Sequence, residues 1–205
     1  QLMAMTNPFR EEAKRDFSSD MTTNQKIITA FKVLRKNLAW DGTYRLYGIN
    51  PSKVLKEKRG SNADLNFVLI SILKDFGFSA YPVVMSHRSA GILPINYPSI
   101  QKLNTFVVAV YDQDNKKYIY LDSSMEIPTL NVLPLELTVS QAYILGSPEA
   151  EEKKWVDLTK ISNSAVFVTI EAAIEGTEIK GKRKSSFTGH QALEFQRRKL
   201  HKKES

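Results

Sequence analysis

The sequence predicts an α+β fold, in which a buried central helix packs on an antiparallel sheet and part of a β-rich domain follows. Residues 65–76 are apolar on almost every side, and a helix without a polar face belongs in a core. Residues 104–111 and 117–122 have the composition of strands and flank a polar loop, which predicts an antiparallel hairpin. A second hairpin is predicted over 164–188, with its turn at Glu175-Gly176-Thr177.

The chain has room for more than one domain, because 205 residues can form one large or two small domains. We place the boundary in the charged stretch 149–154, which separates domain 1–150 from domain 151–205. An isolated hairpin is only marginally stable. We therefore expect the second hairpin and a helix after it to be part of a truncated β-rich domain.

Two amphipathic helices are predicted ahead of the central one. Asn7 and Pro8 form a helix start with proline in the first position. Thr22 and Gln25 have the spacing of a capping box. The apolar residues that follow recur every three or four positions, which predicts a helix over 24–37.

The central helix has a well-marked beginning and end. Ser61 is expected as its N-cap, with Asp64 three residues later in a near capping-box pattern, and Gly77 ends the helix. The dipole and free N–H groups at a helix N-terminus favour negative charge, and a cysteine there would have a lowered pKa. This chain carries Asn62 at that place and contains no cysteine. The surroundings of a nucleophile are thus predicted without the nucleophile.

Four segments in order resemble the core of the transglutaminase-like superfamily. They are 60–64 (GSNAD) with the apolar helix, 77–83 (GFSAYPV), 104–110 (NTFVVAV) and 118–123 (YIYLDS). In that family a Gly-x-Cys-x-Asp turn opens the central helix, a strand with Asn-His-Val follows, and a later strand ends in Leu-Asp-Pro. The resemblance covers roughly residues 20–145. It implies a papain-like core.

The resemblance places the family's Cys on Asn62, its His on Thr105 and its Asp on Asp122, which implies a degenerate triad with no catalytic residue. The chain is accordingly expected not to be an enzyme. It would be a binding or scaffold module of a multidomain bacterial protein in the cell envelope or periplasm. Its partners would be the flanking domains of the same polypeptide and a peptide or glycan bound in the vestigial cleft. Asp122 is equally explained as a turn residue that bonds its own backbone.

Three further residues are candidates for lining the cleft: Trp40, Ser61 and His87. Trp40 lies in a stretch that borders the active-site cleft in the resembled family, and the alternative is a core side chain. His87 opens the long connection 86–103 and is the candidate for a relocated base, with a solvated loop histidine as the alternative.

An alternative function is a hydrolase of the peptidase or amidase type that uses residues outside the family triad. Ser61 would need His87 within reach, because a serine nucleophile requires an adjacent base. A glycosidase would need two facing carboxylates, for which Asp64, Asp122 and Glu126 are available.

Composition bears on several other classes. Without cysteine the chain has no disulfide, no thiolate metal site and no cysteine catalysis. The three histidines are scattered, so we expect neither a metal site nor a cofactor. No apolar run reaches the roughly 18 residues of a membrane span. The net charge is +7, and many cations lie in the tail after residue 179, but no nucleic-acid motif accompanies them, so we expect a solvated face rather than a nucleic-acid partner.

Overall fold

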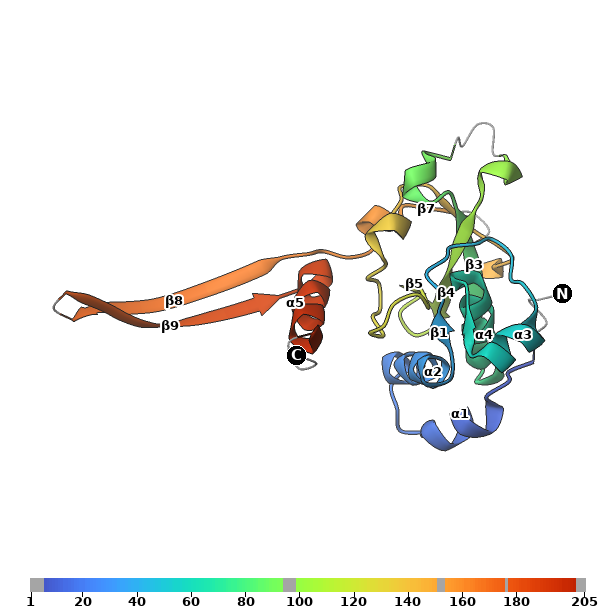
Figure 1. Cartoon of the computed structure of the whole chain (residues 1–205), viewed down its shortest axis with the longest axis horizontal. Coiled ribbons are helices and arrows are strands. Elements are labelled where there is room, and N and C mark those ends of the chain that lie inside the picture. Colours follow the sequence, from blue (N-terminus) through green and yellow to red (C-terminus); the bar gives the residue numbers. More distant parts are fainter. Residues whose placement is uncertain (1–5, 94–98, 151–153, 176, 202–205) are drawn as a thin grey trace. The chain divides into compact units, whose positions relative to one another are not determined.

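The computed structural model describes residues 6–93, 99–150, 154–175 and 177–201, and the chain forms two compact units (Figure 1). They comprise Gln1–Ile161 and Ser162–Ser205. The short strand β7, Trp155–Val156, pairs with β6, Ala142–Ile144, so the residues just after the charged stretch still belong to the sheet of the first unit. The boundary at residue 150 stays a prediction about domains.

Four helices begin where capping side chains satisfy their free N–H groups or where the chain turns. They are α1 (Arg10–Asp16), α2 (Thr23–Asn37), α3 (Pro51–Glu57) and α4 (Asn62–Asp75). The capping boxes predicted at Thr22 and at Ser61 are both formed. Asn7 caps no helix directly, since its side chain instead accepts from the Phe9 N–H at 2.9 Å, just before α1.

The main sheet of the first unit is antiparallel and has the strand order β5-β4-β3-β6-β7. Besides β6 and β7, this sheet contains β3 (Ser79–Met85), β4 (Thr105–Asp112) and β5 (Lys117–Leu121). The hairpin predicted from sequence is β4–β5, with Val108 opposite Leu121. Strands β6 and β7 were not predicted, because strands of three and two residues are too short to show a period-two pattern.

The central helix α4 is confirmed as the buried element, because eleven of its fourteen residues are buried. It packs against β4 and β3 of the sheet and against α2 (Figure 1). Leu65, Leu69, Ile72 and Leu73 have no exposed surface. A mixed α and β unit with a helix buried on an antiparallel sheet is the architecture predicted for this part of the chain.

Short elements connect the helices to the sheet. β1 (Ala39–Trp40) and β2 (Arg59–Gly60) form a small parallel pair directly before α4. Five single 3₁₀ turns follow: η2 (Arg88–Ala90), η3 (Ile100–Lys102), η4 (Leu135–Leu137), η5 (Pro148–Ala150) and η6 (Leu158–Lys160). Turn η2 lies in the long connection after β3 and packs against η4.

The second unit is a long hairpin followed by one helix (Figure 1). β8 (Val166–Glu175) pairs with β9 (Glu178–Phe187), and α5 (Gly189–His201) follows. The predicted hairpin and helix are confirmed, while Gly176 of the predicted turn lies outside the described residues. One face of the hairpin is apolar, and its Ile170, Ile174 and Ile179 are exposed. The ring of Phe195 in α5 stacks on that of Phe187, with centroids 4.7 Å apart.

Candidate functional site

The start of α4 is closed by a capping box. The Ser61 hydroxyl donates to Asp64 Oδ2 at 2.6 Å and accepts from the Asp64 N–H at 3.3 Å. Asp64 Oδ2 also accepts from the Ser61 N–H at 3.0 Å, and Oδ1 accepts from the Ile49 N–H at 2.7 Å. A Cβ on Gly60 would lie 2.9 Å from the Asp64 Cβ, so the turn requires glycine. The Ser61 hydroxyl is thus committed to Asp64 and not to a histidine base.

Asn62, at the first position of α4, joins the helix to strand β4. Its amide nitrogen donates to Thr105 Oγ1 at 2.9 Å and to the Phe106 carbonyl at 3.1 Å. Its amide oxygen accepts from the Arg45 N–H at 2.8 Å. Both amide protons and the amide oxygen are therefore in use, and neither Asn62 nor Thr105 has exposed surface.

Asn66, one turn later, extends these contacts to the end of β5. It donates to the Phe106 carbonyl and to Asp122 Oδ1, both at 2.8 Å, and accepts from the Ser123 N–H at 2.9 Å. Asp122 Oδ2 accepts from the Ser124 N–H at 3.1 Å and from the Ser124 hydroxyl. We call Asn62, Asn66, Thr105 and Asp122 the amide network.

Burial raises the pKa of the Asp122 carboxyl above its ordinary value, and the hydrogen bonds from Ser124 and Asn66 act against that rise. The side chain is 1% exposed. Three hydrogen bonds therefore hold this carboxyl group inside the core. This pattern fixes the helix, β4 and the loop after β5 in one arrangement.

The amide network brings together the three positions matched to the family triad. Asn62 contacts Thr105 directly, and Asp122 is reached through Asn66. Neither a carboxamide nor a threonine hydroxyl supplies the thiolate and imidazole of a cysteine nucleophile and its base. Sequence reasoning missed Asn66, although its signal was present. An asparagine four residues after Asn62 lies on the same face of a helix that is otherwise apolar.

The cleft candidates Trp40 and His87 flank the ring of Tyr44. The ring centroids of Trp40 and Tyr44 are 5.1 Å apart, and those of Tyr44 and His87 are also 5.1 Å apart. Trp40 is half-buried, and its indole N–H donates to the Thr43 carbonyl at 2.9 Å. The Tyr44 hydroxyl lies 3.3 Å from Ser124 Oγ. These aromatic rings thus connect His87 to the outer side of the amide network.

His87 has a hydroxyl partner two residues away in the chain. Its Nδ1 lies 2.9 Å from Ser89 Oγ and accepts from the Ser89 N–H at 3.3 Å. Because Nδ1 accepts from a backbone N–H, the neutral ring carries its proton on Nε2. The His87 N–H donates to Asn104 Oδ1 at 2.7 Å, which fixes the histidine backbone beside the start of β4. Ser89 is exposed. Sequence reasoning considered His87 with Ser61 and missed Ser89.

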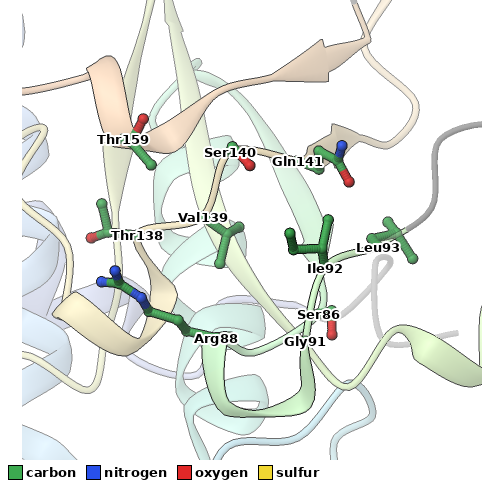
Figure 2. Close-up of a pocket in the computed structure, with 10 residues that line it drawn as sticks. All are labelled: Ser86, Arg88, Gly91, Ile92, Leu93, Thr138, Val139, Ser140, Gln141 and Thr159. Atoms are coloured by element: carbon green, nitrogen blue, oxygen red, sulfur yellow. The ribbon is translucent and has the colours of Figure 1, made fainter.

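A pocket of about 250 Å³ begins in the same turn. Figure 2 shows its walls, which come from the 86–93 connection and the 138–141 segment, together with Thr159. Arg88, the one charged residue of the lining, extends toward the segment that carries Thr138 and Val139. Ile92 contributes an aliphatic side chain that is 77% exposed.

Other kinds of site find little support in the described part of the chain. No three histidine or acidic residues gather there as metal ligands, and no helix there is long and apolar enough to cross a membrane. Asp64 and Asp122 do not form a facing glycosidase pair, because hydrogen bonds from the protein occupy both carboxyl groups.

Solved structures resemble the chain, and two of them are described here. One is a putative cysteine protease from Cytophaga hutchinsonii, with 10% identity and a TM-score of 0.42 over 63% of this chain. The other is a putative protease from Parabacteroides distasonis, with 15% identity and a TM-score of 0.39 over 62% of this chain. The matches span 44% and 28% of those two chains. No protein-family model matches the sequence. No curated protein matches it either.

These neighbours correct one expectation. The prediction that the chain is not an enzyme is wrong against this comparison, because the two structures are described as a putative cysteine protease and a putative protease. At these identities the likeness extends to the fold alone and assigns no catalytic residue.

Proposed function

We propose that the protein is a hydrolase of the peptidase or amidase type that uses residues outside the Cys-His-Asp positions of the transglutaminase-like family. Ser89 is the nucleophile and His87 is its general base. The observation that carries this proposal is the 2.9 Å contact between His87 Nδ1 and Ser89 Oγ. A nucleophile and a base within hydrogen-bond reach form the minimal unit of serine catalysis.

The reaction is acyl transfer to serine and then to water. Ser89 Oγ attacks the carbonyl carbon of an amide, His87 Nδ1 takes the hydroxyl proton, and that proton passes to the departing amine as the C–N bond breaks. Water then attacks the acyl-serine ester, gives one proton through His87 to Ser89 Oγ, and releases the carboxylic acid. The exposed Ser89 leaves room for the substrate carbonyl.

Other serines are less suited to this role. Ser61 Oγ is buried and bound to Asp64. The second unit contains another serine near a histidine, Ser164, whose Oγ lies 3.3 Å from His190 Nδ1. That oxygen also accepts from the His190 N–H at 2.9 Å, at the start of α5, which is the task of a helix cap. Ser164 therefore provides a matched control for Ser89.

The positions matched to the family triad then have a structural task. In this proposal Asn62, Thr105 and Asp122 occupy the places of Cys, His and Asp, and their hydrogen bonds hold α4 on the sheet. We propose in addition that residues 151–205 are part of a β-rich domain and that further domains of the same polypeptide flank this chain. Both proposals rest on the resemblance in sequence.

A fluorophosphonate probe tests the nucleophile directly, because it reacts with activated serines. We expect one adduct on Ser89 in the native protein and none after heat unfolding. The variant Ser89→Ala should lose labelling, and His87→Gln should slow it by about 100-fold or more. The control Ser164→Ala should label at the native rate. An adduct that persists in Ser89→Ala, or a native protein that stays unlabelled, would refute the assignment.

A further inference from the structure

The pocket beside Ser89 has the features of a site for one end of a peptide. Its volume of about 250 Å³ lies below the range of roughly 300–1,000 Å³ for drug-sized ligands, so it suits one terminal residue. Its walls combine one cation, several hydroxyl and amide groups, and aliphatic side chains. All of these residues belong to the first unit.

Arg88 gives the pocket its charge. No carboxylate lines the pocket, and within the described residues no ion pair neutralises the Arg88 guanidinium. Two acidic residues lie two positions from a lining residue. Asp157 bonds Thr159 and pairs with Lys160 at 3.2 Å, and the exposed Glu136 lies in η4, which packs against η2. A guanidinium fork that is free in this way matches the two oxygens of a carboxylate.

Two buried polar atoms of the pocket residues have no hydrogen-bond partner. They are Ser86 Oγ and Gln141 Oε1. A buried polar atom without a partner is unfavourable, and a bound group often explains it. Both atoms are closed to solvent, and an enclosed water molecule or a bound group is the kind of partner that such atoms lack. The aliphatic side chains of Ile92 and Val139 leave apolar surface for the side chain of the bound residue.

We infer that this pocket binds the C-terminal residue of a peptide, with its free carboxylate on Arg88 and an aliphatic side chain against Ile92 and Val139. As a statement about substrate it rests on the proposed hydrolase, since Ser89 follows Arg88 in turn η2 and would cleave the bond that releases this residue. Binding of the peptide C-terminus to this pocket does not itself require catalysis.

The test is fluorescence polarisation with a fluorescein-labelled Ala-Ala-Ala-Leu peptide, in a Ser89→Ala background that prevents turnover. The free carboxylate should bind about 10–100-fold more tightly than the same peptide with a C-terminal amide, which is the effect of one charge-assisted pair. Arg88→Gln should abolish that preference, so that this variant binds the acid and the amide peptide with equal affinity. Arg15→Gln, an exposed arginine in α1, is the matched control and should change neither affinity.

Three results would overturn the inference. The first is equal binding of the acid and the amide, and the second is an equal loss of both in Arg88→Gln. In the third, acetate competes as well as N-acetyl-leucine, which would mean that the pocket recognises any small anion and not a terminal residue. Because no turnover is measured, a failed fluorophosphonate experiment leaves this result intact. Conversely, the probe could label Ser89 while binding shows no preference for the free carboxylate. The hydrolase proposal would then stand, and the inferred site for a peptide C-terminus would be wrong.

Discussion

The amide network and turn η2 contrast in how they treat polar groups. In the amide network the side chains are buried, and the amides of Asn62 and Asn66 use both their oxygens and their nitrogens. Around η2, Ser89 and Arg88 are exposed, and the nearby Ser86 Oγ has no partner. Buried and satisfied polar groups specify a structure, whereas accessible or unpaired ones remain available for a ligand.

The contrast separates the positions that the sequence resemblance matches to a catalytic site from the place where we propose the nucleophile and its base. At the helix start, Asn62 joins α4 to β4 through its hydrogen bonds to Thr105 and to the Phe106 carbonyl. Turn η2 and its N-cap residue match no family motif, yet the segment 87–90 contains a histidine, an arginine and a serine. Position in a fold is thus a weaker guide to chemistry than the state of the side chains.

Among the variants that test this contrast, Asn66→Ala is expected to lower the free energy of unfolding the most. This change leaves Asp122 Oδ1 and the Ser123 N–H without partners in the core, so the free energy of unfolding should fall by about 2–4 kcal/mol. Urea unfolding followed by tryptophan fluorescence measures it, since Trp40 and Trp155 both lie in the first unit. The exposed Asn24→Ala in α2 is the control and should stay within about 0.5 kcal/mol of the native value. Equal effects would mean that the network does not stabilise the unit.

Asp122 predicts a pH dependence of that stability. Its folded pKa is raised by burial above that of the unfolded chain, so the folded state holds the proton more tightly. The contribution of Asp122 is therefore largest at acid pH and falls as pH rises above about 4, with a slope of at most about 1.4 kcal/mol per pH unit. The pKa of Asp112 is lowered by its hydrogen bond from Asn115, which gives the opposite slope.

The diagnostic quantity is accordingly the difference between native protein and Asp122→Asn. The variant is less stable at every pH, because an amide cannot accept from both Asn66 and Ser124. Its free energy of unfolding should nevertheless decline less between pH 4 and pH 7 than that of the native protein. Parallel pH curves would show that Asp122 has the same proton affinity in the folded and unfolded states.

A smaller decrease in the free energy of unfolding is expected for Ser61→Ala, next to Asn62 of the amide network. The hydroxyl caps α4, and the loss of such a cap costs about 1 kcal/mol. Ser89→Ala in η2 is the matched serine, and its exposed side chain should contribute less than about 0.5 kcal/mol. The two urea midpoints compared side by side measure this difference. A greater loss at Ser89 than at Ser61 would reverse the contrast.

The smallest effect, of opposite sign, is expected for Ser86→Ala. Its buried hydroxyl has no partner, so its removal breaks no hydrogen bond and relieves the cost of burying a polar atom. We expect stability to be unchanged or raised by up to about 1 kcal/mol in the same urea titration. A loss above 1 kcal/mol would mean that the Ser86 hydroxyl has a partner in solution, such as an ordered water molecule.

The sequence by itself determined the elements whose signal is local. The capping boxes at Thr22 and Ser61 follow from side chains three residues from their partners, and the apolar circumference of 65–76 identifies the core helix. The hairpins β4–β5 and β8–β9 likewise follow from strand composition on both sides of a turn. In each case the stabilising contacts join residues near one another in the chain, so a single stretch contains the whole argument.

Only the tertiary structure decided how distant polar groups pair. Asn66 meets Asp122 across 56 residues of chain, and Asn62 meets Thr105 across 43, so no local pattern shows that these side chains satisfy one another. The pocket likewise needs the 138–141 segment to fold back over the connection after β3. Strands β6 and β7 are too short to have a periodicity, and they are strands only because β6 pairs with β3 and β7 pairs with β6. Such long-range pairings lie outside any single stretch of sequence, because whether a polar group is satisfied depends on the partner that the fold brings to it.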